Sequence, residues 1–594
     1  ETAKAENAED LDMLLDSFAE KTPFVAPWNV LAITFTNKAA NEMKERLHKI
    51  VGDAANELWC GTFHSMCLRM LRRNADRFGY TSDFTIYDAD DSKKVITECM
   101  KQLNVDEKQI PAKFIMNQIS MAKNRLMTPQ DYDAEVNNDH KLQQVASIYL
   151  LYQNRLQDAM AMDFDDIIMK TVVMLRDHED IRVRYQNQFR YVLIDEFQDT
   201  NFAQFEFAKI ISAVYGNLMV VGDDDQSIYK FRGANIRNIL DFEQVFEEAK
   251  VIKLEQNYRS SQNILDAANG VIHHNHGRKE KSLWTEQEAG ERICFEQFDT
   301  AYEEAEYIVG DIRHRVDIGE GNYNQFAILY RTNAQSRIFE EKFVTANIPY
   351  KVVGGVNFYA RKEIKDVLAY LKTIDNGMDD IAVKRIINLP KRGIGATTIS
   401  KVEDFAESHD ISFYDALKNA DQIDTLGRAA AKIKPFVTLI QTFRSKVGLM
   451  PLVNLVEEVL EDTGYLAELQ AEGTEEAEAR IENIDELISK MAAYEAGEDN
   501  PTLSGFLEEV ALVADIDSLN ENADYVVLMT LHSAKGLEFP YVYLAGMEDG
   551  IFPSYMTITS DDPSEMEEER RLCYVGITRA MKRLNLSCAR MRMI

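Results

Sequence analysis

The chain has 594 residues, of which 45% are hydrophobic and 28% charged, a composition that supports several domains with buried cores. Six scattered cysteines without a CxxC pair argue against a zinc site or an iron–sulfur cluster and indicate a reducing compartment. No run of about 20 apolar residues and no signal-peptide pattern occurs, so we expect a cytoplasmic protein without membrane contact. The formal net charge of −33 excludes a uniformly basic surface, and any polyanion would need a narrow basic groove.

Apolar runs in the first part of the chain are typical of parallel strands alternating with helices. They are Val30–Phe35, Tyr191–Ile194, Leu218–Val221 and Val251–Leu254. Because Tyr191–Ile194 is apolar throughout, we expect a strand that is covered on both faces. From about Tyr87 to Arg184 the pattern is helical with little strand character, which predicts an insertion.

A second set of strand-like runs follows the same plan. It comprises Phe326–Tyr330, Tyr525–Met529, Tyr541–Leu544 and Leu584–Cys588, with a mostly helical insertion from about Tyr359 to Asn522. The predicted fold class is therefore α/β, with two parallel-sheet domains that each carry a mainly helical insertion. We place the first domain at 1–86 and 185–256 with its insertion at 87–184, and the second at 257–358 and 523–594 with its insertion at 359–522.

Two acidic segments close neighbouring predicted strands. Asp195-Glu196 follows Tyr191–Ile194, and the segment 222–227, Gly-Asp-Asp-Asp-Gln-Ser, follows Leu218–Val221. The carboxyl ends of parallel strands are where open α/β sheets bind ligands. Phosphoryl transfer needs a carboxylate for Mg²⁺ and a group that orients water, so Asp195 suits the metal and Glu196 the water. A lone Asp-Glu pair is more often a solvated turn, but two such segments in series favour nucleotide hydrolysis.

Eight segments in order resemble the motifs of superfamily 1 DNA helicases of the UvrD/PcrA/Rep group, especially the PcrA type. They are 33–40, 62–65, 195–200, 222–234, 254–260, 326–337, 528–539 and 567–580. The resemblance covers nearly the whole chain. It implies two RecA-like motor domains with ATP and Mg²⁺ in the cleft between them, single-stranded DNA across their top, and 3′-to-5′ translocation.

Carried over by position, the resemblance also assigns roles in the cleft. Asp195 would hold Mg²⁺, Glu196 would position water, and Gln226 would sense the γ-phosphate, although a turn-stabilising amide is the alternative for Gln226. The remaining expected cleft residues are Tyr258 for base stacking, Arg259 and Arg579 for the γ-phosphate, and Gly536 and Glu538 facing the nucleotide. A guanidinium neutralises charge that develops on the transferring phosphoryl group.

A translocating motor needs aromatic rings that stack on any base. We expect Phe35, Phe63, Tyr229 and Phe231 to serve here, because they follow predicted strands in loop positions where core aromatics are less expected. The other expected DNA contacts are Thr36, Asn37, His64, Arg232, Asn333 and His532, with Arg331 and Lys535 as weaker candidates and Lys391 and Arg392 in the glycine-containing hairpin 390–395. For the lone histidines a structural hydrogen bond is the alternative.

One departure from the resembled family concerns the phosphates. No GxxxxGK[ST] segment occurs, and the family's glutamine-bearing adenine motif is missing as well. We interpret residues 1–24, which are acidic with a helical apolar stripe, as the tail of an insertion in a longer helicase. The sequence thus predicts an ATP-dependent helicase of DNA repair or replication that acts on single strands and junctions, with this chain hydrolysis-deficient. Partners could include repair or replication proteins. The alternative is a non-hydrolysing single-stranded DNA-binding protein with the motor fold.

Overall fold

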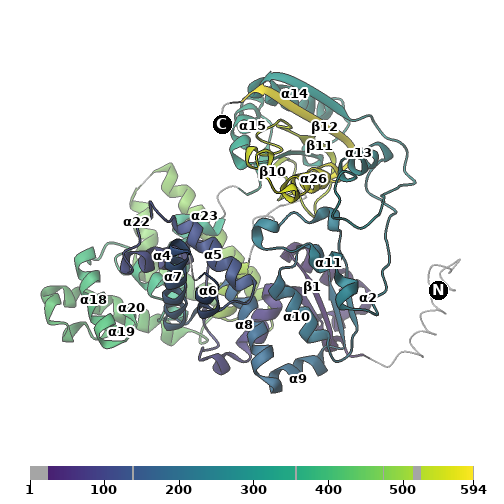
Figure 1. The fold of residues 1–594 in the computed structure, drawn as a ribbon. Helices are drawn as coiled ribbons and strands as arrows, with labels where there is room; N and C mark the ends of the chain where they lie inside the picture. The colour runs from purple at the N-terminus through teal and green to yellow at the C-terminus, as the bar shows by residue number, and fades with distance from the viewer. Residues whose placement is uncertain (1–24, 137–138, 355–357, 473, 513–522, 593–594) are drawn as a thin grey trace.

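The computed structural model describes residues 25–136, 139–354, 358–472, 474–512 and 523–592. Figure 1 shows two bodies built on sheets, one with β1 and α8 to α11 and one with β10 to β12 and α26, next to a body made of helices. The predicted α/β class with two parallel sheets and helical insertions is confirmed. Within the described ranges no helix is both long and apolar enough to cross a bilayer.

The first sheet has the strand order β2-β1-β5-β6, and all its pairs are parallel. Its strands are β1 (Val30–Thr34), β2 (Trp59–Thr62), β5 (Tyr191–Ile194) and β6 (Leu218–Val220). Its core is closed by α3 (Phe63–Arg72), α8 (Phe164–Asp177), α9 (Glu179–Gln188) and α10 (Phe202–Ser212). Since the strands run in one direction, their carboxyl ends meet at one edge.

Two expectations for this sheet are wrong. Val251–Leu254 is not a strand, because β6 ends the sheet and a strand needs a hydrogen-bonding neighbour; the Leu254 side chain is 79% exposed. Nor is β5 covered equally on both faces. Val192 and Ile194 are 1% exposed, whereas Tyr191, which points to the other face, is 39% exposed.

The second sheet has the order β7-β12-β11-β8-β10-β9 and is parallel throughout. Its strands are β7 (Cys294–Thr300), β8 (Phe326–Tyr330), β9 (Tyr350–Val352), β10 (Val526–Thr530), β11 (Phe539–Leu544) and β12 (Ala580–Met591). Around it lie α13 (Gln262–Ile272), α14 (Ala301–Asp317), α15 (Ser336–Ala346) and α26 (Pro563–Ile577). The buried β8 carries no charge, in keeping with its central position.

The first insertion contains α4 (Ala89–Gln102), α5 (Ala112–Asn124), α6 (Pro129–Glu135) and α7 (His140–Asp158). It also holds a parallel pair of three-residue strands, β3 (Thr85–Tyr87) and β4 (Ala161–Asp163), which the helical pattern did not predict. The second insertion contains α16 (Lys362–Asp375), α17 (Asp380–Ile386), α18 (Ala396–His409), α19 (Phe413–Lys418), α20 (Ala430–Lys446), α21 (Leu452–Thr463), α22 (Tyr465–Glu472), α23 (Glu475–Gly497) and α24 (Leu503–Leu512).

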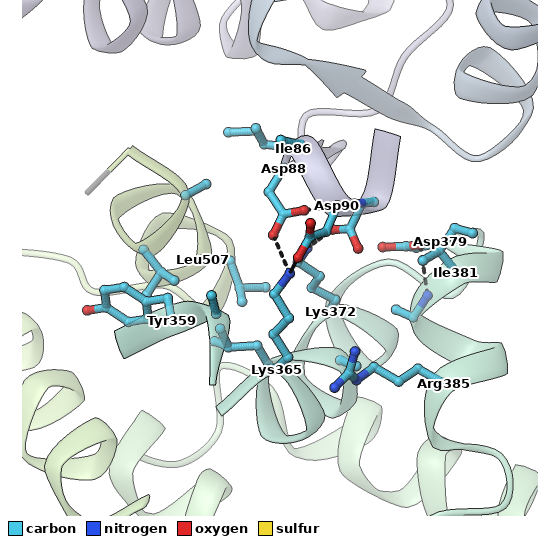
Figure 2. A pocket seen from close by; sticks show the side chains of 18 of the residues that line it. Ile86, Asp88, Asp90, Tyr359, Lys365, Lys372, Asp379, Ile381, Arg385 and Leu507 are labelled. Atoms are coloured by element: carbon cyan, nitrogen blue, oxygen red, sulfur yellow. Dashed lines mark hydrogen bonds and ion pairs between the residues drawn. The ribbon is translucent and has the colours of Figure 1, made fainter. Parts of the chain in front are cut away.

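The two insertions contact one another around a cavity of about 360 Å³ (Figure 2). Lys365 of α16 forms an ion pair with Asp88 at 3.2 Å, and Lys372 pairs with Asp91 at 2.9 Å. Nearby, the Tyr87 hydroxyl donates to Asp379 Oδ1 over 2.9 Å. These contacts explain why the helices of both insertions form one body in Figure 1.

Candidate nucleotide cleft and nucleic-acid track

The carboxylates of Asp195 and Glu196 lie at the carboxyl end of β5. Glu196 adopts a left-handed backbone with φ of 53°, a strained conformation for a non-glycine residue that is common at functional sites. Its N–H donates to Asp195 Oδ1 over 2.9 Å. Burial raises the pKa of the Asp195 carboxyl, and the charge of Glu196 adds to the effect. A cation here would relieve this repulsion, so the pair fits Mg²⁺ chemically.

The described residues contain no group of three or more metal-ligating side chains of the His, Cys, Asp and Glu types. Mg²⁺ commonly binds through one or two carboxylates together with water and substrate phosphates. Asp195 is therefore sufficient as a protein ligand only when phosphate oxygens complete the coordination.

Lys535 reaches this edge from the second sheet-containing body. Its Nζ lies 3.4 Å from Glu196 Oε2, donates to the Gln226 carbonyl over 2.8 Å, and contacts Asp199. Burial raises the pKa of Asp199 to about 6, although the Lys535 charge opposes that shift. Lys535 thus connects the two sheet-containing bodies at the carboxyl end of β5, whereas the sequence suggested only a weak candidate.

The Gln226 amide is held between two side chains from different bodies. Its Nε2 donates to Asp223 Oδ2 over 2.8 Å, and its Oε1 accepts from Arg579 Nη2 over 3.3 Å. These contacts fix the amide orientation, because a flipped amide would face a carboxylate with oxygen and a guanidinium with nitrogen. The structure therefore brings together Gln226 and Arg579, as the sequence predicts.

Arg579 is 1% exposed and makes further hydrogen bonds within its own body. Its Nε donates to the Val575 carbonyl over 3.0 Å and its Nη1 to the Leu537 carbonyl over 2.9 Å. Burial and the nearby charge of Arg259 lower its pKa to about 10, so the guanidinium remains charged near neutral pH. Arg579 is consequently a firmly held cation beside Gln226.

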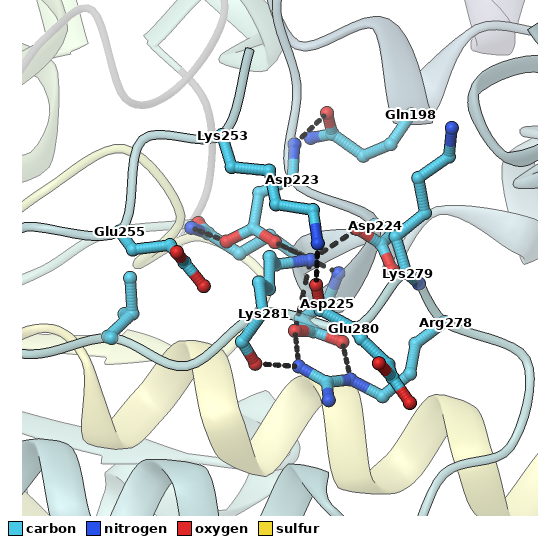
Figure 3. A network of polar contacts seen from close by, with 12 residues as sticks. Gln198, Asp223, Asp224, Asp225, Lys253, Glu255, Arg278, Lys279, Glu280 and Lys281 are labelled. Carbon is cyan, nitrogen blue, oxygen red and sulfur yellow. Dashed lines mark hydrogen bonds and ion pairs between the residues drawn. The ribbon is translucent and has the colours of Figure 1, made fainter. Parts of the chain in front are cut away.

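A charged network next to Gln226 joins the same two bodies (Figure 3). Lys281 Nζ lies 2.9 Å from Asp223 Oδ1 and 3.1 Å from Asp225 Oδ2, and it also contacts Asp224. Arg278 binds Asp225 with two hydrogen bonds of 2.9 and 2.6 Å. Neither Lys281 nor Arg278 is predicted from the sequence, where their local signal is the mostly basic segment 278–281.

Of the other expected nucleotide residues, Tyr258, Gly536 and Glu538 are exposed and Arg259 is half-buried. The Tyr258 ring is 77% exposed and its hydroxyl donates to Gln256 Oε1 over 2.8 Å. Arg259 forms an ion pair with Glu538, the residue that precedes β11. Gly536 has a φ of +82°, a backbone conformation that favours glycine, and no atom lies within 4 Å of a hypothetical Cβ.

Exposed aromatic and basic groups cluster beside Gln226. Phe231 is 66% exposed, and its ring centroid lies 5.3 Å from that of His532 at nearly right angles. The Tyr229 hydroxyl donates to the His532 carbonyl over 3.1 Å, and the Arg232 guanidinium lies 5.3 Å from the Tyr229 ring centroid. Burial, with the Arg331 and Arg232 charges, lowers the pKa of His532 to about 4, so its ring is neutral.

Three residues expected on the DNA track have structural positions instead. Phe63 is 2% exposed between the rings of Phe35 and Phe207, because the capping box of Thr62 and Ser65 starts a helix at Phe63 and turns its ring into the core. His64 packs on Phe164, and burial lowers its pKa to about 4.

Arg392, the third, faces into its insertion and donates to the carbonyls of Ile386 and Leu389 over 2.8 Å each. Lys391 in the same hairpin is exposed.

The segment around Phe35 contacts the second insertion. Thr36 caps α2 (Asn37–Val51) by accepting from the Ala39 N–H over 3.2 Å, and Asn37 Nδ2 donates to the Leu512 carbonyl of α24 over 2.7 Å. Asn333 donates to the Gly354 carbonyl over 3.2 Å in the second body. A nucleic acid that used Asn37 would therefore compete with the end of α24.

Comparison with known proteins agrees with this arrangement. Residues 18–247 match the UvrD/REP helicase N-terminal domain, and residues 252–591 match the UvrD-like helicase C-terminal domain. The chain belongs to the UvrD-like helicase family. A protein from Staphylococcus epidermidis named ATP-dependent DNA helicase PcrA is 47% identical over 572 residues, covering 96% of this chain and 78% of the relative. The protein of the same name from Staphylococcus aureus is 48% identical over 573 residues, with the same coverage of both chains.

Proposed function

We propose that the protein is an ATP-dependent DNA helicase that moves 3′-to-5′ along single-stranded DNA and unwinds duplex at junctions. The observation that carries the proposal is the convergence of Arg579 and Lys535 from one body on Gln226 and Glu196 of the other. A binding protein without hydrolysis has no chemical need for a buried arginine at that position. The named activity of the two Staphylococcus relatives supports the same conclusion.

In this proposal the cleft residues divide the work of phosphoryl transfer. When bound, ATP would supply the phosphoryl group and Mg²⁺ would neutralise part of its charge. Asp195 would hold the metal. Glu196 would orient the attacking water and accept its proton as water bonds to the γ-phosphorus and the bond to ADP breaks, and Tyr258 would stack on the base. Gln226, Arg259 and Arg579 contact the γ-phosphate, while Gly536 and Glu538 border the nucleotide. Because Arg579 and Gln226 lie on different bodies, hydrolysis would be coupled to cleft closure.

The track for DNA is proposed to run past Phe35, Asn37, Tyr229, Phe231, Arg232, Asn333 and His532. Phe231 offers a free ring face, and stacking on any base is worth about 1–3 kcal/mol. Lys391 would contact duplex phosphates from the second insertion.

The six free cysteines support a cytoplasmic location.

A second candidate function rests on the absence of a GxxxxGK[ST] segment in these residues. That loop holds the β- and γ-phosphates, so we propose that this chain by itself binds single-stranded DNA but hydrolyses ATP barely or not at all. A steady-state ATPase assay with a single-stranded oligonucleotide, paired with fluorescence anisotropy, tests this. DNA-stimulated ATP turnover comparable to that of an intact helicase would refute the proposed lack of hydrolysis. Absence of DNA binding would refute the proposed binding of single-stranded DNA. Translocation on strands blocked at either end tests the direction.

A further inference from the structure

An open pocket of about 720 Å³ lies at the opposite end of the first sheet from Asp195. Trp28 lies in the short turn before β1 and Trp59 begins β2, whereas Asp195 follows the carboxyl end of β5. Since these strands are parallel, the pocket lies at their amino ends, whereas Asp195 lies at their carboxyl ends. This pocket therefore belongs to neither the nucleotide cleft nor the DNA track.

Three arginines line this pocket. Arg69 lies in the last turn of α3, Arg73 is the residue that follows this helix, and Arg184 comes from α9. Among the described residues none of the three forms an ion pair with a carboxylate, although the chain holds 99 acidic and 66 basic side chains. Glu57 also lines the pocket, but it is exposed and pairs with none of them in the described structure. The pocket is thus a local excess of positive charge on an acidic protein.

Two of the three arginines lie over the ring of Trp59. The guanidinium carbons of Arg69 and Arg73 lie 4.1 and 5.0 Å from the ring centroid of Trp59. Trp59 is itself fixed by edge contacts with Tyr185 and Phe189. A guanidinium stacked on an indole uses its face and leaves its N–H edge free for a ligand.

The three guanidinium groups of the pocket favour a phosphate over a carboxylate as the ligand. A carboxylate has two oxygens and satisfies one guanidinium fork, whereas a phosphate presents enough oxygens for several forks at once. Burial and the neighbouring Arg73 charge lower the pKa of Arg69, so a bound anion would also relieve repulsion between these cations. The Trp28 side chain, 50% exposed at the pocket wall, offers an apolar ring beside the arginines.

We propose that this pocket binds a nucleotide unit, with Arg69, Arg73 and Arg184 holding its phosphate and Trp28 stacking on its base. The unit could be a free nucleotide or part of a strand, and both present the same chemistry. The site would give the protein a second contact with nucleotides that is independent of hydrolysis in the cleft.

Thymidine 3′,5′-bisphosphate is a suitable probe, measured by calorimetry and by the fluorescence of the chain's three tryptophans. Arg73→Gln and Arg184→Gln should each weaken binding by about tenfold or more, because each removes a charge-assisted contact. Trp28→Phe should reduce the fluorescence response more than the calorimetric affinity. Arg46→Gln, which removes the same charge from a side chain that is 73% exposed on α2, is the matched control and should change nothing. Circular dichroism verifies that each variant folds.

Several results would overturn the assignment. One is an affinity for the bisphosphate that is unchanged in Arg73→Gln and Arg184→Gln. Another is tighter binding of a hexa-aspartate peptide than of the bisphosphate. Equal affinities for inorganic phosphate and for the bisphosphate would contradict the proposed stacking of Trp28 on a base. Oligothymidylates separate the two sources: affinity that rises with length through the pocket arginines identifies a strand, and affinity independent of length identifies a free nucleotide.

Discussion

Arg579 donates a hydrogen bond to the side chain of Gln226 over 3.3 Å, although 353 positions separate the two residues in the sequence. Gln226 is at the same time bound to Asp223, which is paired with Lys281. The Gln226 amide therefore contacts Arg579 directly on one side. On its other side it contacts Asp223, which pairs with Lys281, so both sides lead to cations of the second sheet-containing body. Any motion that opens the cleft must break this contact, so it is a natural place to couple hydrolysis with domain movement.

Replacing Arg579 should separate catalysis from DNA binding. In a version of the protein that carries a phosphate-binding loop, Arg579→Ala should reduce DNA-stimulated turnover by a factor on the order of 10³ or more. Affinity for DNA without nucleotide should change little. Since the guanidinium also binds the Val575 and Leu537 carbonyls, Arg579→Lys is needed as a second variant that keeps the charge. Turnover and thermal unfolding are measured together; normal turnover in Arg579→Ala would contradict the role.

Lys281 should be important for stability. Its side chain is 17% exposed among three aspartates, and Lys281→Met would leave those charges without their common partner. Removing one partner of a buried pair typically costs about 3–5 kcal/mol, so urea unfolding should show a loss of that order. Lys209→Met is the control, because Lys209 is 52% exposed and its ion pair with Glu206 should contribute only about 0–1 kcal/mol. Equal stability of both variants would argue against the network.

How far the sequence predicts this structure depends on the range of the interactions. Tyr191–Ile194 is predicted to the residue, because a short apolar run bounded by polar residues is a local signal. Val251–Leu254 has the same local signal and is not a strand, since strand formation also requires a neighbour. Phe63 is predicted to stack on DNA because it follows a predicted strand. The direction of its ring is set by the helix that begins at Phe63, which the position after the strand does not report.

The candidate site shows the same division. Gln226 and Arg579 could be predicted because each lies within a recognisable segment. The pairing of Lys281 with Asp223 could not, because those residues are joined only by the packing of two bodies and no local pattern reports such a contact. The contact of Asn37 with Leu512 has the same origin.

The half-buried imidazole of His532 should make stability depend on pH. Its folded-state pKa of about 4 lies below the ordinary value of 6.5, so protonation favours the unfolded chain. The stabilising contribution is fully present above about pH 6.5 and is lost as the pH falls toward 4. His532→Gln should therefore lose less unfolding free energy than the parent between pH 7 and 5, with His64 supplying a remaining dependence of the same sign. His48→Gln, on an exposed helix surface, should match the parent; a His532→Gln profile identical to it would refute the assignment.

Phe231 is the most direct test of the DNA track. Its ring is 66% exposed between Arg232 and His532, so removal should cost little folding stability. Phe231→Ala should weaken single-stranded DNA binding by about 1–3 kcal/mol for every base sequence, since each base offers a face to stack on. Fluorescence anisotropy with homopolymeric and mixed oligonucleotides measures this.

Phe63→Ala is the informative comparison for Phe231→Ala, because the same substitution in the core should cost about 3–5 kcal/mol of folding stability. Circular dichroism and urea unfolding separate the two effects. If Phe231→Ala leaves every affinity unchanged, the exposed ring is not part of the track. If Phe231→Ala unfolds the protein while Phe63→Ala does not, the assignment of surface and core must be reversed. Loss of affinity with an unchanged unfolding curve is the result expected from a ring that faces the DNA rather than the core.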